Sequence, residues 1–181
     1  MAHTSALGCC GMVDSGKEVI MIDSPNTKNV CKYKIMLAKT IERGKINIVG
    51  VDPNIAEDLV EECIKQNLIS SLKNVKKYKR QGTISTSRFD NSKIAYFPDG
   101  YRKKQKDTVS PRALKHITEL TNIKKEYIDK IRCIMCYVIQ RRDVESFQAS
   151  NVDPIYKEAF SKSIVSGVEI IPLQIEWKED G

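Results

Sequence analysis

The sequence contains no uninterrupted apolar run of about eighteen residues, the length that a membrane-spanning helix requires. Its first residues, Met1 to Thr4, do not combine a positively charged stretch with a following apolar one, so we expect no secretory signal. Internal repeats and low-complexity tracts are also absent. With 41% hydrophobic and 29% charged residues, the composition is typical of a globular protein that buries a core and has no membrane partner.

The six cysteines do not have the spacing of a disulfide framework. Cys133 and Cys136 lie inside the apolar run 133–139, which is typical of a strand. Residues three apart on a strand point to opposite faces, so this pair is poorly placed to bind one zinc ion. We therefore expect free thiols and an intracellular, reducing compartment, either cytoplasmic or nuclear.

The net charge of +7 is concentrated in one segment. Residues 71–116 contain thirteen Lys and Arg but three Asp and Glu, whereas the segments before and after them are slightly acidic. A basic patch favours binding to phosphates, because each Lys or Arg can release a counterion from a polyanion. The same charge also fits a solvated basic loop.

The first fifty residues predict a small β unit with three short strands, at 19–22, 33–40 and 46–51. Asp52-Pro53-Asn54 then breaks the strand pattern and starts a helix. We expect Asn54 to be its N-cap, with Glu57 completing a capping box and the helix ending near Asn67.

The rest of the chain predicts an α/β unit. Two basic strands are expected over residues 72–90, followed by a loop over 91–108. Helices should begin at Ser110-Pro111 and at Asp153-Pro154, the second with Ile164 on its inward side. Between and after them lie a strand at 133–139, apolar on both faces, and one at 168–177. Strand, helix and strand in this order predict a parallel crossover unit.

Several short motifs follow one another along nearly the whole chain: Ala2-His3-Thr4-Ser5, Ser24-Pro25-Asn26, Val51-Asp52-Pro53-Asn54, Ser87-Arg88-Phe89-Asp90, Phe97-Pro98-Asp99, Arg112 with His116, and Asp153-Pro154. This series resembles the sugar fermentation stimulation (SfsA) family. The resemblance implies an OB-like β domain, here 1–52 and incomplete, joined to a PD-(D/E)xK nuclease-like α/β domain, here 53–181. It also implies DNA binding.

One segment departs from the family pattern. The family has a strand with Glu-Val-Lys between its Ser-Arg-x-Asp and Phe-Pro-Asp motifs, but here six residues separate Asp90 from Phe97 and contain no Glu-x-Lys. Six residues are too few for a strand, a turn and a connection, so we expect a missing central strand, low stability and possible self-association. We also expect the family's first strand and last segment to be absent.

The site candidates follow from this comparison. Asp90 occupies the family's metal position, as a vestigial catalytic residue, and Asp99 could add a second carboxylate; both also fit turn or capping roles. His116 could orient a phosphate or act as an acid or base. The expected nucleic-acid contacts are Lys76, Lys77, Lys79, Arg80, Arg88, Arg102, Lys103, Lys104 and Arg112, with Tyr78 and Tyr101 placed to stack on bases.

Three functions remain compatible with these residues. The first is nucleic-acid binding, with DNA expected, by a protein without nuclease activity. The second is an active Mg²⁺-dependent nuclease that recruits other carboxylates, such as Asp107 or Glu119. The third is a non-catalytic binder of an acidic protein. The missing Glu-x-Lys argues against the second function, and we expect no cofactor unless Mg²⁺ binds at a working nuclease site.

Overall fold

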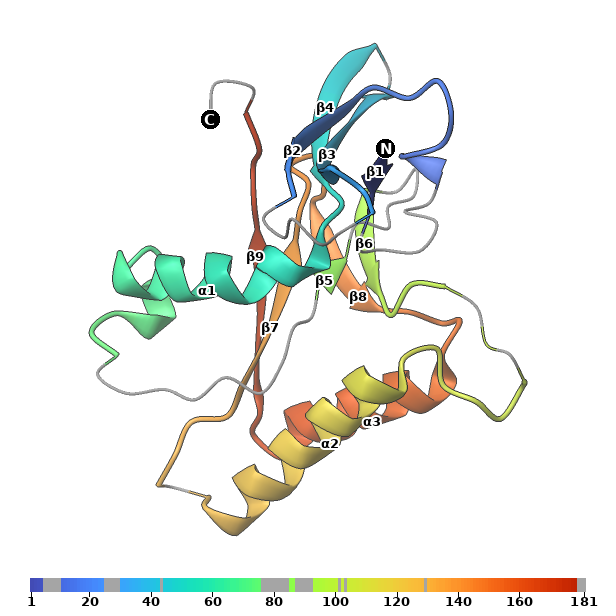
Figure 1. Cartoon of the computed structure of the whole chain (residues 1–181). Helices are drawn as coiled ribbons and strands as arrows, with labels where there is room; N and C mark the ends of the chain where they lie inside the picture. Colours follow the sequence, from blue (N-terminus) through green and yellow to red (C-terminus); the bar gives the residue numbers. More distant parts are fainter. Residues whose placement is uncertain are drawn as a thin grey trace.

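The computed structural model describes residues 1–4, 11–24, 30–42, 44–75, 85–86, 93–100, 102, 104–128 and 130–178. Figure 1 shows a small sheet of N-terminal strands at the top, and long strands with helices below it. The mixed α/β architecture expected from the sequence is confirmed.

The N-terminal sheet is built around strand β3, Tyr33–Glu42. Strands β2, Val19–Asp23, and β4, Lys45–Gly50, pair with it in antiparallel fashion, and the short β1, Ala2–His3, pairs in parallel with its first two residues. Ala38 lies opposite both Val19 and Val49, and this face packs on the buried Met12. The three predicted strands are confirmed.

The turn after β4 differs from the prediction. Asp52, not Asn54, is the capping residue: its Oδ1 accepts hydrogen bonds from the backbone N of Asn54 at 3.1 Å and from Asn54 Nδ2 at 3.0 Å. The reason is Pro53, whose fixed φ starts a 3-10 turn, Pro53–Ile55, two residues earlier than expected. Helix α1, Ala56–Lys65, continues from that turn.

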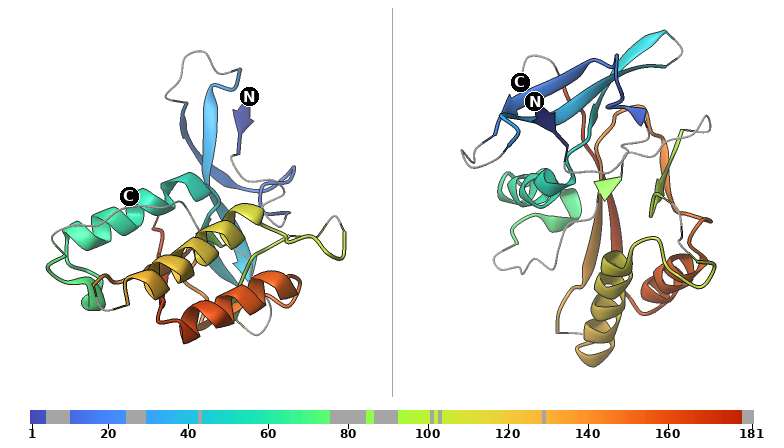
Figure 2. Two further views of the ribbon diagram at one scale, coloured as in Figure 1. Left: turned by 90° about the horizontal axis from the view of Figure 1, so that it is seen from below. Right: turned by 45° about the vertical axis from the view of Figure 1, so that its right-hand side comes forward.

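The C-terminal strands form two parallel groups. Strand β7, Ile134–Ile139, lies between β5, Ser85–Thr86, and β9, Glu169–Gln174, and it is largely buried, as predicted for a central strand. Helices α2, Pro111–Glu126, and α3, Pro154–Val165, run side by side in both views of Figure 2. No helix in the described part of the chain is long and apolar enough to cross a membrane.

The predicted loop over 91–108 is wrong in one part. Ile94–Phe97 forms strand β6, which pairs in parallel with β8, Ser146–Ala149. Ala95 and Phe97 alternate with less buried residues and point into the core. The short interval between Asp90 and Phe97 therefore does contain a strand, because its partner lies about fifty residues later in the chain and supplies the pairing.

The C-terminal core is rich in aromatic side chains. The rings of Phe97, Tyr137 and Tyr156 contact one another at centroid distances of 5.6 Å and 5.3 Å from Phe97. The hydroxyls of Tyr137 and Tyr156 lie 2.5 Å apart, and burial raises the pKa of both phenols above the ordinary value. Ile164, predicted to point inward, is 48% exposed, because Ser163 takes the inward position seven residues after Tyr156.

The described cysteines, Cys31, Cys63, Cys133 and Cys136, are free, as expected. Cys136 is the most perturbed of them: burial, with a smaller effect of the neighbouring Cys63, raises the pKa of its thiol to about 12. Such a thiol remains protonated and unreactive at neutral pH.

Candidate nucleic-acid interface

A loop of residues 98–109, here called the basic loop, connects β6 to α2 and projects at the right of Figure 1. Within it, Arg102 Nη1 donates to the carbonyl of Gln105, and the backbone N of Asp107 donates to the carbonyl of Lys104 at 3.0 Å. These local bonds give the described part of the loop a defined conformation. Asp107, considered a possible metal ligand, is half-buried in it.

The end of the basic loop is attached to α3 through Asp153. This side chain is fully buried, and its Oδ2 accepts hydrogen bonds from the backbone N of Val109 at 2.7 Å and from Thr108 Oγ1 at 2.5 Å. Its Oδ1 accepts from the backbone N of Tyr156 at 3.0 Å, which makes Asp153 the predicted N-cap of α3 as well. One carboxylate therefore holds two segments far apart in sequence.

Helix α2 begins as predicted, with the Ser110 hydroxyl accepting a hydrogen bond from the backbone N of Ala113 at 3.3 Å. Ala113 and Ile117 are buried against the core, so the exposed Arg112 lies on the solvent side. Arg112 Nε donates to His116 Nε2 at 3.3 Å, and this confirms that the two residues share a face.

The ring of His116 lies against Arg112, and its role as an acid or base stays a prediction. Its Nε2 accepts from Arg112, so the proton of the neutral ring lies on Nδ1. That Nδ1 atom is buried and has no hydrogen-bond partner within the described residues. The hydrogen bond between the two side chains therefore links the orientation of the His116 ring to that of the Arg112 guanidinium.

Three described arginines outside this region are paired with carboxylates. Arg132 forms two bonds with Glu169, at 2.7 Å and 2.6 Å, and Arg142 lies 2.9 Å from Glu176. Arg141 is buried between two carboxylates. The charges of these three side chains are therefore largely compensated within the protein.

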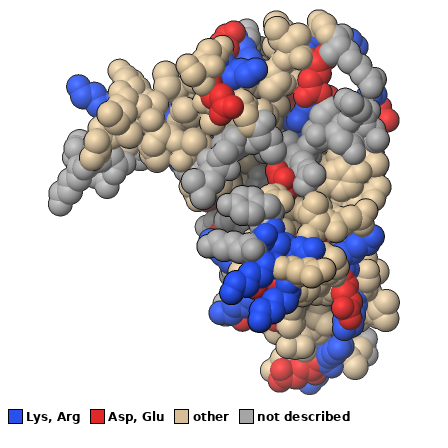
Figure 3. Space-filling model, turned by 90° about the vertical axis from the view of Figure 1, so that its right-hand side faces the viewer, with Lys and Arg blue, Asp and Glu red and all other residues tan. Residues whose placement is uncertain are grey.

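Four cations at the basic loop and the start of α2 differ from these arginines. Among the described residues, no carboxylate lies within ion-pair distance of Arg102, Lys104, Lys106 or Arg112, a set called here the basic surface. Lys104, Lys106 and Arg112 are exposed, and Arg102 is half-buried. Figure 3 shows Lys and Arg side chains gathered on this side of the molecule.

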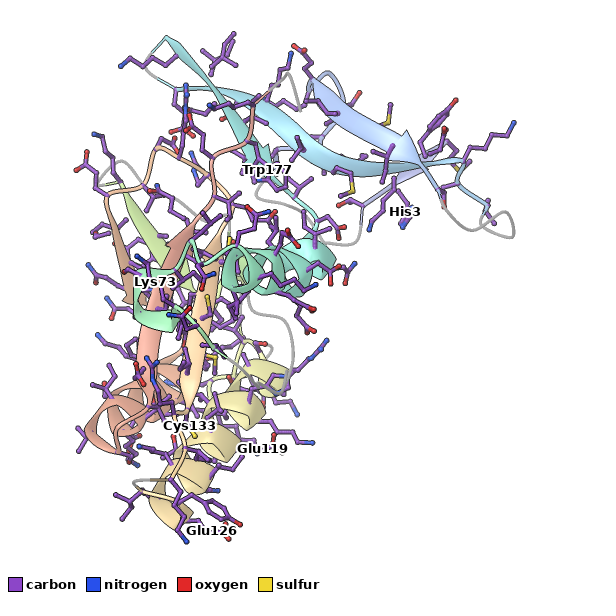
Figure 4. All side chains as sticks on the ribbon, turned by 90° about the vertical axis from the view of Figure 1, so that its left-hand side faces the viewer. His3, Lys73, Glu119, Glu126, Cys133 and Trp177 are labelled. Carbon is purple, nitrogen blue, oxygen red and sulfur yellow. The ribbon has the colours of Figure 1, made fainter. Side chains whose placement is uncertain are left out.

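The predicted basic segment does not form one continuous patch over its described residues. Lys73 is labelled on the side seen in Figure 4, opposite to the side in Figure 3. The carbonyl of Ser71, which accepts from Arg132 Nη1 at 2.9 Å, attaches this part of the chain near the start of β7. The two ends of the segment 71–116 therefore face different directions.

Many predicted site residues lie outside the described part of the chain: Lys76, Lys77, Tyr78, Lys79, Arg80, Arg88, Asp90, Tyr101 and Lys103. Asp99 lies two residues after the end of β6 and is half-buried, while Glu119 lies 3.7 Å from Lys115. Where the structure describes side chains, no three His, Cys, Asp or Glu residues come together as a possible metal site.

The sequence predicts Asp153 as a helix cap but does not indicate its contact with the basic loop. The Asp-Pro pair indicates a cap because the capping hydrogen bond joins residues that are three apart in the sequence. Thr108 and Val109 lie 45 and 44 residues away from Asp153, and no local pattern marks such a contact.

The fold and this interface define a mixed α/β protein with a small N-terminal sheet and a basic surface beside its C-terminal helices. The family described as "Sugar fermentation stimulation protein RE domain" matches residues 91–181. The chain therefore belongs to the sugar fermentation stimulation protein (SfsA) family.

Similar proteins extend this match over nearly the whole chain. A sugar fermentation stimulation protein homolog of Clostridium tetani is 28% identical over 195 residues, covering 99% of this chain and 82% of the relative. A homolog from Maricaulis maris is 26% identical over 200 residues, covering 97% and 79%. The structure of Pyrococcus furiosus SfsA in complex with Ca²⁺ is similar with a TM-score of 0.62 at 20% identity, over 87% of this chain and 72% of that one. This last similarity shows a shared fold.

Proposed function

We propose that this chain binds nucleic acid, with DNA as the expected ligand. The observation that carries the proposal is the basic surface, whose four cations have no carboxylate partner among the described residues. Like charges held close together repel one another, so a polyanion that contacts all of them is bound favourably. The positive end of α2, to which Arg112 belongs, adds to this attraction for phosphate.

We also propose the finer architecture that the family resemblance implies. The antiparallel sheet centred on β3 supports an OB-like unit over residues 1–52, and β4 ends at Gly50, just before Asp52 begins the next helix. The parallel strands β5, β7 and β9, with α2 and α3, support a nuclease-like unit over 53–181.

The salt dependence of binding tests the proposal. If each of the four cations neutralises one phosphate of duplex DNA, the slope of log K against log salt is about −3.6, and affinity falls about 150-fold between 50 and 200 mM salt. The measurement is the fluorescence anisotropy of labelled single- and double-stranded DNA and of RNA. A flat salt titration would contradict the proposal.

A matched pair of variants locates the surface. Charge reversal at Lys104 and Lys106 removes two proposed phosphate contacts and should bring the slope to about −1.8. Charge reversal at Lys125 and Lys130 changes the net charge equally, but these exposed residues lie at and beyond the opposite end of α2. Equal losses in both variants would show general attraction without this surface. Binding of acidic proteins but of no oligonucleotide would favour the third candidate function.

We further propose that the chain does not cleave nucleic acid at a useful rate. The absent Glu-x-Lys supports this view, because hydrolysis needs an ion held by converging oxygens and a positioned water. The Ca²⁺ recorded with the Pyrococcus furiosus protein keeps the Mg²⁺-dependent nuclease as a second candidate. A nuclease assay with Mg²⁺ or Mn²⁺ decides between them. Metal-dependent cleavage that disappears in Asp90→Ala would establish the second candidate.

A further inference from the structure

The basic loop is held at both ends by one short turn, residues 150–153. At the entry of the loop, the backbone N of Ser150 donates to the carbonyl of Phe97 at 2.8 Å. At its exit, Asp153 accepts the bonds from Thr108 and Val109. A Cβ added at Gly100, which has φ +124°, would lie 3.3 Å from Val109 Cγ1, so the two ends of the loop also pass close to each other.

The two oxygens of Asp153 have separate tasks. Oδ1 caps α3 through Tyr156, whereas Oδ2 holds the basic loop. Asp153 is fully buried, and no Lys or Arg among the described residues is within ion-pair distance of it. Its charge is stabilised by three hydrogen-bond donors and by the positive end of α3. Capping alone needs one oxygen, so the bonds to the loop are an additional function of this carboxylate.

We propose that Asp153 is the positioning residue of the basic surface. By holding Thr108 and Val109 directly before the cap of α2, it sets where the loop cations Arg102, Lys104 and Lys106 stand relative to Arg112. Without this contact the loop cations and the helix cation no longer engage one phosphate backbone together. This inference rests on the proposed function and assigns Asp153 no direct contact with the ligand.

The substitution Asp153→Ser separates the two tasks. A serine hydroxyl still caps a helix, but it is shorter and has a single oxygen, so it cannot reach the loop at the same time. The matched control is Ser110→Ala, which removes the cap of α2 and leaves the bonds from Thr108 and Val109 to Asp153 in place. The milder Thr108→Val removes one of the two bonds to the loop and serves if Asp153→Ser does not fold.

The melting temperature of each variant is measured first. The salt slope of DNA binding and the rate of tryptic cleavage after Lys104 and Lys106 are then measured well below the lowest melting temperature. We expect Asp153→Ser to lower the salt slope by about 1–2 and to accelerate cleavage in the loop severalfold. Thr108→Val should have smaller effects in the same direction. Ser110→Ala should lower the melting temperature without changing the slope or the cleavage in the loop.

The outcomes separate the inference from the proposed function. If the wild-type chain binds no nucleic acid, the proposed function fails, while the tryptic readout still shows whether Asp153 holds the loop. Unchanged cleavage and an unchanged salt slope in both Asp153→Ser and Thr108→Val would overturn the positioning role. Equal effects in Ser110→Ala would also overturn it, because a general loss of stability would then explain them.

Discussion

The substitution Arg141→Met tests how the N-terminal sheet is joined to the rest of the chain. Arg141 is 3% exposed, and its guanidinium contacts Asp143 at 2.7 Å through two bonds and Glu42 at 2.7 Å through a third. Glu42 ends β3, whereas the other two residues follow β7. Methionine has a similar length but no charge, so two carboxylates would remain near each other without their cation.

The expected loss in the free energy of unfolding can be estimated from the burial of the Arg141, Asp143 and Glu42 side chains. Removing one partner of a buried ion pair costs about 3–5 kcal/mol, and we expect about 3 kcal/mol because the carboxylates are partly accessible. In a chain of this length, each kcal/mol lowers the melting temperature by about 2–4 °C, so the expected fall is about 6–12 °C.

The neighbouring Arg142 provides the control. It pairs with Glu176, but both side chains are about half exposed, at 49% and 46%. An exposed pair contributes about 0–1 kcal/mol, so Arg142→Met should shift the melting temperature by a few degrees at most. Thermal and urea unfolding of both variants at pH 7 is the assay. Equal losses in the two variants would refute the argument that burial determines the value of these ion pairs.

The pH dependence gives an independent check on the same group. Burial alone would raise the pKa of Asp143, but the hydrogen bonds and charge of Arg141 hold that pKa below its ordinary value. A carboxylate with a lowered pKa stabilises the folded state above its unfolded pKa of about 3.9, and this stabilisation is lost as the pH falls through the folded pKa. The free-energy difference between wild type and Arg141→Met should therefore shrink below about pH 4. A difference that stays constant down to pH 2 would contradict this assignment.

Two further substitutions and one chemical modification test the packing of the core. Gly50→Ala would place a Cβ 2.1 Å from Gln140 Oε1, so unfolding measurements should show a loss of about 1–3 kcal/mol. Tyr137→Phe leaves the buried hydroxyl of Tyr156 without its partner and should cost about 1–3 kcal/mol in urea unfolding; a neutral result would show that the hydroxyl pair is not needed. Cys136, with a thiol pKa of about 12, should resist alkylation at pH 8 until the protein unfolds, and mass spectrometry checks this.

The sequence alone determined the features that depend on neighbouring residues. Strands β2, β3, β4 and β7 follow from apolar patterns, and the starts of α2 and α3 follow from Ser110-Pro111 and Asp153-Pro154. A capping hydrogen bond spans about three residues, and the apolar pattern of a strand repeats every two, so both are complete within a short window. The concentration of positive charge in 71–116 was equally visible.

Tertiary structure decided which distant groups meet. The sequence predicts a loop where strand β6 forms. These four residues become a strand because they pair with β8, and no pattern near Ile94 indicates a partner so far along the chain. The same limit applies to Asp153, whose loop contact is non-local, and to the division of cations into paired and unpaired groups. An arginine becomes compensated or available through the carboxylates that the fold brings to it, and charge counting along the chain does not contain that information.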